Sequence, residues 1–137
     1  MLDAAEAKLA PVPAWTPPEN PEYPFALIAS RAVFPQGSAT MCEKSSILRR
    51  EYPESCLEMN EQDAERLGLR PGRPVTVSSI SGSMTRNLAL SESVPAGCVH
   101  APAFFGDSPN SLASYEGDPV SGTPAYKACA VRIEAVK

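Results

Sequence analysis

Six short segments rich in β-branched and apolar residues constrain the fold of this chain more than any other feature. They lie at residues 23–30, 55–59, 74–80, 83–90, 98–101 and 128–134. Short runs of this kind, bounded by Gly, Pro, Asn and Ser, are typical of β-strands. Together with one clear helix and a shorter one expected at 45–52, they predict a small closed or nearly closed β-barrel. The order in which the strands pair does not follow from the sequence.

The clearest local signal is a helix over residues 60–68. Asn60 is a preferred N-cap residue, acidic residues fill the first turn, and Gly68 can end the helix in a left-handed conformation. Ala64 and Leu67 are expected to face the core. A Pro-Gly turn then leads into the next strand.

The segment 104–127 is the longest one without an evident element, and it mixes apolar with polar residues. Loops beyond about 12–15 residues without secondary structure are usually functional or disordered. Its aromatic residues favour burial, while an Asn, two Asp and a Lys can recognise a polar ligand. We therefore predict an ordered ligand-binding loop between two strands. Residues 31–41, with Pro, Gly and small hydroxyl residues, form a second candidate ligand loop.

The length of 137 residues suits one domain. Residues 1–21 are rich in proline and are typical of an extended linker or tail. Residues 22–137 are therefore expected to form the barrel domain.

The charge balance excludes some partners. The formal net charge is −4, and the chain lacks the basic stripe that nucleic-acid binding requires. An anionic ligand must therefore be held by a local site. No apolar run approaches the roughly 20 residues of a membrane helix, and the N-terminus lacks the basic and apolar regions of a signal peptide. We expect a soluble, cytoplasmic protein without a membrane segment.

The four cysteines, Cys42, Cys56, Cys98 and Cys129, are widely spaced and form no Cys-x-x-Cys pair. With His100 as the single histidine, this pattern does not favour a zinc or iron–sulfur site. Free, mostly buried thiols are expected instead, and His100 is expected to be a strand residue with its hydrogen bonds satisfied. We predict no metal ligand and no catalytic residue in this chain.

Several short motifs follow one another in a characteristic order along residues 22–134. They are Arg31 after the first strand, Ser38-Ala39-Thr40-Met41, Glu58-Met59-Asn60, Arg66-Leu67-Gly68, Pro71-Gly72, Pro95-Ala96-Gly97, Asn110-x-Leu112, Asp118-Pro119 and Thr123-Pro124-x-Tyr126-Lys127. In this order the set resembles the C-terminal molybdopterin-dinucleotide-binding domain of the molybdenum/tungsten bis-pterin oxidoreductases, with formate dehydrogenases as the nearest match.

The resemblance implies a mainly β fold, a small six-stranded double-psi β-barrel with one or two short helices. It also implies that the chain is a cofactor-binding subunit or domain of a formate-dehydrogenase-like complex. The cofactor would be molybdopterin guanine dinucleotide carrying molybdenum or tungsten, shared with a large catalytic oxidoreductase subunit. Iron–sulfur electron-transfer subunits are implied as further partners. The family's metal ligand lies in another domain, so the chain is not expected to be catalytic alone.

The residues that match the family's cofactor-binding loops are Arg31, Ser38, Ala39, Thr40, Met41, Phe105, Asn110, Asp118, Tyr126 and Lys127. Arg31 and Lys127 offer cationic donors to a phosphate, and Asn110 can both donate to and accept from a heterocycle edge. Each also has an ordinary alternative: a surface ion pair for Arg31, an exposed strand-edge cation for Lys127, and a turn that bonds its own backbone for Asn110.

Three alternative functions remain open at this level. The chain could be the small barrel subunit of a formylmethanofuran dehydrogenase. It could be a non-catalytic interaction module that has lost cofactor binding, which the departures from the family pattern at residues 35–37 and at Phe105 favour. It could also be a self-processing barrel enzyme such as an aspartate decarboxylase, cleaved at Gly37-Ser38 or Gly82-Ser83.

Overall fold

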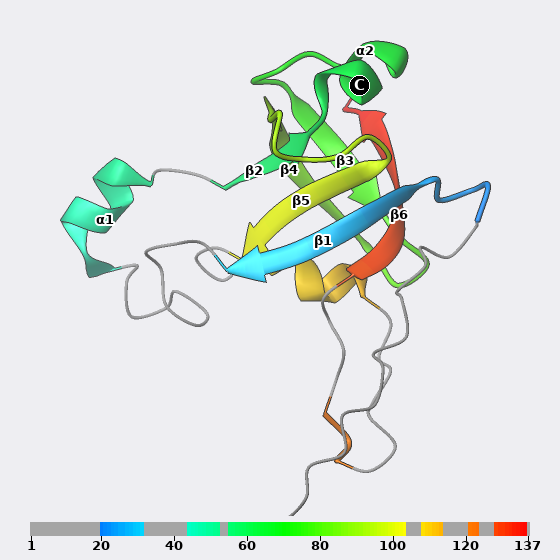
Figure 1. Ribbon diagram of the computed structural model, residues 1–137. Coiled ribbons are helices and arrows are strands. Elements are labelled where there is room, and N and C mark those ends of the chain that lie inside the picture. Colours follow the sequence, from blue (N-terminus) through cyan, green and yellow to red (C-terminus); the bar gives the residue numbers. More distant parts are fainter. Residues whose placement is uncertain are drawn as a thin grey trace, which may run out of the picture.

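The computed structural model describes residues 20–31, 44–52, 55–103, 108–113, 121–123 and 128–136. Their elements are β1 (Phe25–Arg31), α1 (Ser46–Glu51), β2 (Cys56–Met59), α2 (Glu61–Arg66), β3 (Pro74–Ser78), β4 (Ser83–Leu90), β5 (Cys98–Ala103), the 3-10 helix η2 (Pro109–Leu112) and β6 (Ala128–Ala135) (Figure 1). The six predicted strands and both predicted helices are therefore confirmed. The predicted boundary between a tail and a domain at residues 21 and 22 stays a prediction, because residues 1–19 lie outside the described residues.

The six strands close into a barrel in the order β1-β5-β2-β4-β3-β6. β1 is parallel to β5 and β2 is parallel to β4, whereas the remaining neighbours are antiparallel. Exchanging the first three strands with the last three maps this order and these directions onto themselves. The two parallel pairs are thus related by an internal pseudo-two-fold axis, and the fold is a double-psi β-barrel, as predicted.

Alternating apolar residues from the strands fill the barrel. The large strand side chains that are most deeply buried are Leu27, Leu57, Met59, Val75, Val77, Leu88, Val99 and Val131. Burying one such side chain contributes roughly 1.5–3 kcal/mol. Buried residues alternate with more exposed ones along β2 and β3. Each strand therefore contributes one face to a single core, so short strands are enough to form it.

Helix α2 covers one end of the barrel and begins at its predicted cap. The Asn60 side chain accepts a hydrogen bond from a backbone N–H of the first turn at 3.0 Å, and Ala64 is buried as predicted. The prediction that Leu67 faces the core is wrong, since it is 39% exposed. The reason is that Gly68, at a φ of 66°, turns the chain and directs Leu69 into the core instead.

The register of the strands defines two ends of the barrel. Parallel β1 and β5 end together, with Arg31 opposite Ala103, and β6 begins beside them because Ala128 pairs with Ile28. Antiparallel β2 begins at the same end. We call this the loop end, because the strands flanking residues 32–43, 104–107 and 124–127 end or begin there. The opposite α2 end carries α2, and η2 lies on the other side of the strands from α2 (Figure 1).

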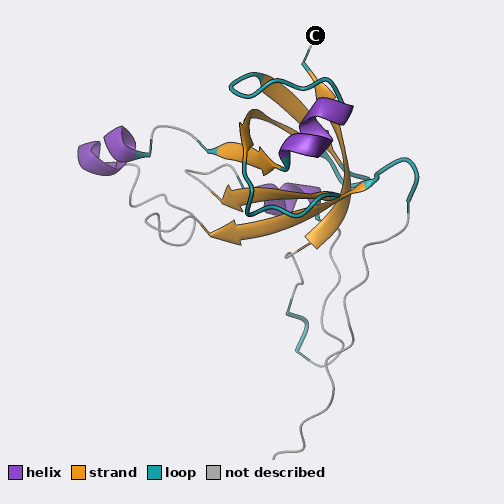
Figure 2. Cartoon of the chain, turned by 45° about the horizontal axis from the view of Figure 1, so that its top comes forward, coloured by secondary structure: helices purple, strands orange, loops and turns teal. Residues whose placement is uncertain are grey.

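Helix α1 lies to one side of the barrel in both views (Figure 2). Ser45 caps this helix, with its side chain accepting from the backbone N–H of Leu48, and none of the helix residues is buried. Within the described part of the chain, no helix combines the length and the apolar character needed to cross a membrane.

Candidate functional site

Two of the ten residues predicted to bind a cofactor belong to the described residues, and both lie near the loop end. Arg31 is the last residue of β1, and Asn110 lies in η2. The other eight, Ser38, Ala39, Thr40, Met41, Phe105, Asp118, Tyr126 and Lys127, lie outside the described residues. The backbone pairing of Arg31 with Ala103 puts the end of β1 directly beside the start of the long β5–β6 connection.

Asn110 is exposed on a short helix that is itself well anchored. Ser108 caps η2 by accepting a hydrogen bond from the Asn110 backbone N–H at 3.3 Å. Pro109 and Leu112 are buried, and Leu112 is completely inaccessible to solvent. The sequence predicted an ordered loop here and missed this helical turn. Its cause is the Ser-Pro start, which favours a helical N-terminus, together with burial of Leu112.

The β3–β4 turn holds η2 in place. The buried Ser79 hydroxyl donates to the Leu112 carbonyl at 2.6 Å and accepts from the Ser81 backbone N–H at 3.1 Å. A Cβ on Gly82 would come to 3.2 Å from the Ser111 carbonyl oxygen, so a side chain at position 82 would require the two segments to move apart by a few tenths of an ångström. The β3–β4 turn therefore fixes the position of η2 at the loop end.

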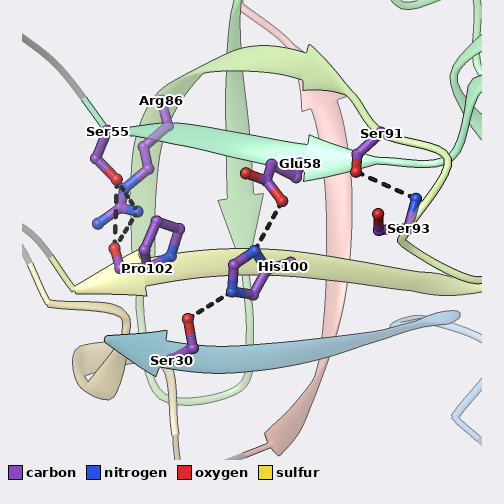
Figure 3. Close-up of polar contacts among 8 residues, drawn as sticks. All are labelled: Ser30, Ser55, Glu58, Arg86, Ser91, Ser93, His100 and Pro102. Carbon is purple, nitrogen blue, oxygen red and sulfur yellow. Dashed lines mark hydrogen bonds and ion pairs between the residues drawn. The ribbon is translucent and has the colours of Figure 1, made fainter. Parts of the chain in front are cut away.

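A buried arginine joins β4 to the segments before β2 and at the end of β5. Arg86 is 4% exposed, and its Nη1 donates to the Ser55 hydroxyl and to the Pro102 carbonyl, both at 2.7 Å (Figure 3). Ser55 also donates to the Pro102 carbonyl at 3.3 Å. Three segments distant in sequence thus meet at one carbonyl oxygen.

A second polar array crosses β1, β5 and β2. His100 Nδ1 lies 2.9 Å from Glu58 Oε2, and His100 Nε2 lies 2.5 Å from the Ser30 hydroxyl (Figure 3). The prediction that His100 is a satisfied strand residue is confirmed. The three side chains come from three different strands, because Ser30 lies in β1, His100 in β5 and Glu58 in β2. We interpret the array as a cross-strand brace.

A cavity of about 370 Å³ lies at the α2 end, away from the predicted site. Its lining residues are Asn60, Glu61, Gln62, Leu90, Ser91 and Glu92. Two carboxylates in this lining disfavour a phosphate-bearing ligand, because like charges repel. The size of this cavity is therefore no argument for placing a dinucleotide there.

Cys56, Cys98 and Cys129 are free, but they are half-buried rather than buried, which corrects that part of the prediction. Cys56 and Cys98 alternate with the buried residues of β2 and β5, whereas Cys129 shares the inward face of β6 with Val131 and packs against the core. Burial nevertheless raises the pKa of the Cys129 thiol above its ordinary value, because desolvation disfavours the thiolate. Cys42 lies outside the described residues.

The buried polar residues Asp63, Ser79 and Arg86 were missed by the sequence predictions. For Arg86 a signal existed, since it lies two residues before buried Leu88 in an alternating strand, and so at an inward position. Asp63 and Ser79 carried no such signal, because each lies among other polar residues within a helix or a turn.

Comparison with known proteins identifies the family. A model of the "Molydopterin dinucleotide binding domain" matches residues 25–130. F420-dependent formate dehydrogenase 2 subunit alpha of Methanococcus maripaludis is 35% identical over 116 residues, which are 84% of this chain and 17% of the relative. F420-dependent formate dehydrogenase subunit alpha of Methanocaldococcus jannaschii is 32% identical over 139 residues, 99% of this chain and 21% of the relative.

Acetylene hydratase from Pelobacter acetylenicus has the same fold, with a TM-score of 0.70 and 19% sequence identity over 84% of this chain and 19% of that one. The chain thus spans about a fifth of the length of the relatives it matches. Because the family match covers the barrel from β1 into β6, this chain belongs to the molydopterin dinucleotide binding domain family.

Proposed function

We propose that this chain binds molybdopterin guanine dinucleotide at its loop end, as one wall of a larger molybdenum or tungsten oxidoreductase of the formate dehydrogenase type. The family match over residues 25–130 carries the proposal. The two formate dehydrogenase alpha subunits at 35% and 32% identity support formate as the substrate. Since the chain corresponds to 17% and 21% of those relatives, the remaining catalytic machinery belongs to a partner chain or domain.

The residues of the loop end fit such a ligand. Arg31, at a strand end, can donate to a pyrophosphate, and the exposed amide of Asn110 can donate and accept at a purine edge. The long connection that carries Asn110 starts beside Arg31, because Ala103 pairs with it. In the proposed site, Lys127 contributes a second cation and Asp118 an acceptor for guanine N–H groups.

The ligand must lie on the barrel and not inside it. Core residues such as Leu57, Val77 and Val99 are fully buried, and a close-packed interior has no room for a dinucleotide. The barrel residues can therefore bind and orient one side of the ligand and exclude water from it. When bound, the cofactor supplies the metal centre for two-electron oxidation, and this chain needs no redox group of its own.

The test is to assemble the chain with its partner and to measure guanosine monophosphate released by acid hydrolysis, together with molybdenum and tungsten. We expect nucleotide and metal in the wild-type complex and lower amounts of both in Arg31→Ala. Arg73→Ala is the matched control, because Arg73 is an exposed arginine at the α2 end. The isolated chain should fold without metal and without formate oxidation. Unchanged nucleotide and metal in the Arg31 variant, or formate oxidation by the chain alone, would overturn the proposal.

A further inference from the structure

The seam between β2 and β5 has the shortest backbone ladder in the described barrel. It contains two register pairs, Glu58–His100 and Met59–Val99, whereas β1 and β5 share six. The ladder stops on the side of the loop end, where Pro102 has no backbone N–H to donate. Side chains must therefore hold the two strands at this end of the seam.

Arg86 does so from inside the barrel. It shares the inward face of β4 with Leu88, and its Nη1 reaches both sides of the seam, Ser55 before β2 and Pro102 in β5, at 2.7 Å each. Burying a guanidinium is unfavourable unless its donors are satisfied, and an apolar residue of similar volume often fills such a position with equal or greater stability. Space filling alone therefore does not account for an arginine here.

The position of the two acceptors links Arg86 to the cofactor site. Pro102 pairs with Ser30 and the next residue, Ala103, pairs with Arg31. Fixing the Pro102 carbonyl therefore fixes the end of β1 as well as the point from which the chain leaves for η2 and Asn110. Ser55 lies on the opposite side of the seam, directly before β2.

We propose that Arg86 is a positioning residue for cofactor binding: it sets the separation of β2 and β5 at the loop end, and thereby the placement of Arg31 and Asn110 against the dinucleotide. This inference rests on the proposed function. It goes beyond that function because Arg86 belongs to the barrel wall and is not one of the proposed ligand-binding residues. It acts through the backbone of Pro102 and the hydroxyl of Ser55.

A purely structural role makes a different prediction, and His100 provides the comparison. The His100 array braces the same seam on the half-exposed side of the strands, at the register pair Glu58–His100. If Arg86 contributed only stability, then Arg86→Met and His100→Ala would weaken cofactor retention in proportion to their loss of stability.

The experiment uses the assembled oxidoreductase with Arg86→Met, Arg86→Lys and His100→Ala. Retention of molybdopterin guanine dinucleotide is followed as guanosine monophosphate per complex during dialysis, and unfolding by urea is measured on the same samples. We expect Arg86→Met to release the dinucleotide about tenfold faster, the effect of one charge-assisted hydrogen bond that the ligand loses when Arg31 or Asn110 is displaced. Arg86→Lys should recover part of the loss, and His100→Ala should change retention by less than about twofold. Equal retention in wild type and Arg86→Met, or equal losses in the Arg86 and His100 variants at matched stability, would overturn the inference.

Two further arms keep the test decisive. Ser55→Ala removes only one acceptor of Arg86 and replaces Arg86→Met in the test if Arg86→Met does not fold. Unchanged retention of the dinucleotide in Ser55→Ala would also contradict the inference. Amide hydrogen exchange over residues 98–103 and 108–113 tests the positioning without any cofactor, and it should rise in Arg86→Met while α2 stays protected. A wild-type complex that holds no dinucleotide would refute the proposed function, whereas unchanged exchange would refute the role of Arg86.

Discussion

The two ends of the barrel use buried polar side chains for different purposes. At the α2 end, Asp63 accepts from the Gly97 backbone N–H at 2.6 Å and pairs with Arg66 at 2.9 Å. Asn60 caps α2 and also donates to the Val94 carbonyl at 3.1 Å. These bonds join α2 to the turn before β5. At this end of the barrel, Asp63 and Asn60 thus bind backbone groups of the turn and tie it to α2.

At the loop end, buried polar groups bind residues within or next to the long connections between strands. Ser79 binds the Leu112 carbonyl under η2, and Arg86 binds Ser55 and the Pro102 carbonyl. These anchors leave Asn110 exposed. The comparison teaches that one end of the barrel is built for stability, and that the other is built to present polar residues on a fixed base. Substitutions at the two ends should therefore separate stability from cofactor binding.

The largest effect is expected from Leu112→Ala at the loop end. Leu112 is completely buried, and truncation of a buried leucine costs about 2–5 kcal/mol. Urea unfolding should show this loss, and η2 should lose its amide protection. Ile80→Ala at the same end is the control, because Ile80 is 83% exposed and should change stability by less than about 0.5 kcal/mol. A small loss in Leu112→Ala would show that η2 is not anchored through this residue.

The next effect is expected at the α2 end from Asp63→Ala. It removes the carboxylate that accepts from the partly buried Gly97 N–H, which should cost about 1–3 kcal/mol of unfolding free energy. Asp63→Asn keeps an acceptor oxygen and loses chiefly the pair with the 65% exposed Arg66, and such surface pairs contribute little. In the assembled complex neither variant should alter dinucleotide retention. If an Asp63 variant lost cofactor while the amides at the loop end stayed protected from hydrogen exchange, the separation of stability and cofactor binding between the two ends would be wrong.

A smaller effect is expected from Ser79→Ala, which removes the hydroxyl under η2. Loss of the bond to the Leu112 carbonyl should cost about 0.5–1.5 kcal/mol. Hydrogen exchange over residues 108–113 should rise more than exchange in α2. Ser93→Ala is the control, since Ser93 is an exposed serine in the turn at the α2 end. Equal exchange changes in both variants would contradict a specific support of η2.

The smallest effect concerns the pH dependence of stability through Cys129. Burial raises the pKa of this thiol above the ordinary value of 9.0, so the folded state binds its proton more tightly than the unfolded state. Its contribution to stability is therefore complete below about pH 9 and is lost as the pH rises through the higher folded-state pKa. Urea midpoints between pH 7 and about pH 10 should fall more steeply for the wild type than for Cys129→Ala. Parallel curves would refute the assignment to Cys129.

The sequence alone determined the local elements, because their signals act over a few residues. Asn60 and Gly68 marked the two ends of α2, and Ser45 marked the start of α1. Turn residues separated the six strands, and the order of motifs identified the family. Leu67 shows the limit of this reasoning: helical periodicity assigned it to the core, but the left-handed Gly68 ended the helix and exposed it.

Only the tertiary structure decided which strands pair and which polar groups meet. Ser30 and His100 lie 70 positions apart, Ser79 and Leu112 33, and Ser55 and Arg86 31. Such contacts depend on barrel closure and on the parallel pairing of β1 with β5, and neither leaves a local pattern in the sequence. The alternation of β4 indicates that Arg86 faces inward, but it does not indicate which groups accept its hydrogen bonds. Those depend on the short β2–β5 ladder, because the ladder ends before Pro102 and its carbonyl accepts from Arg86 instead.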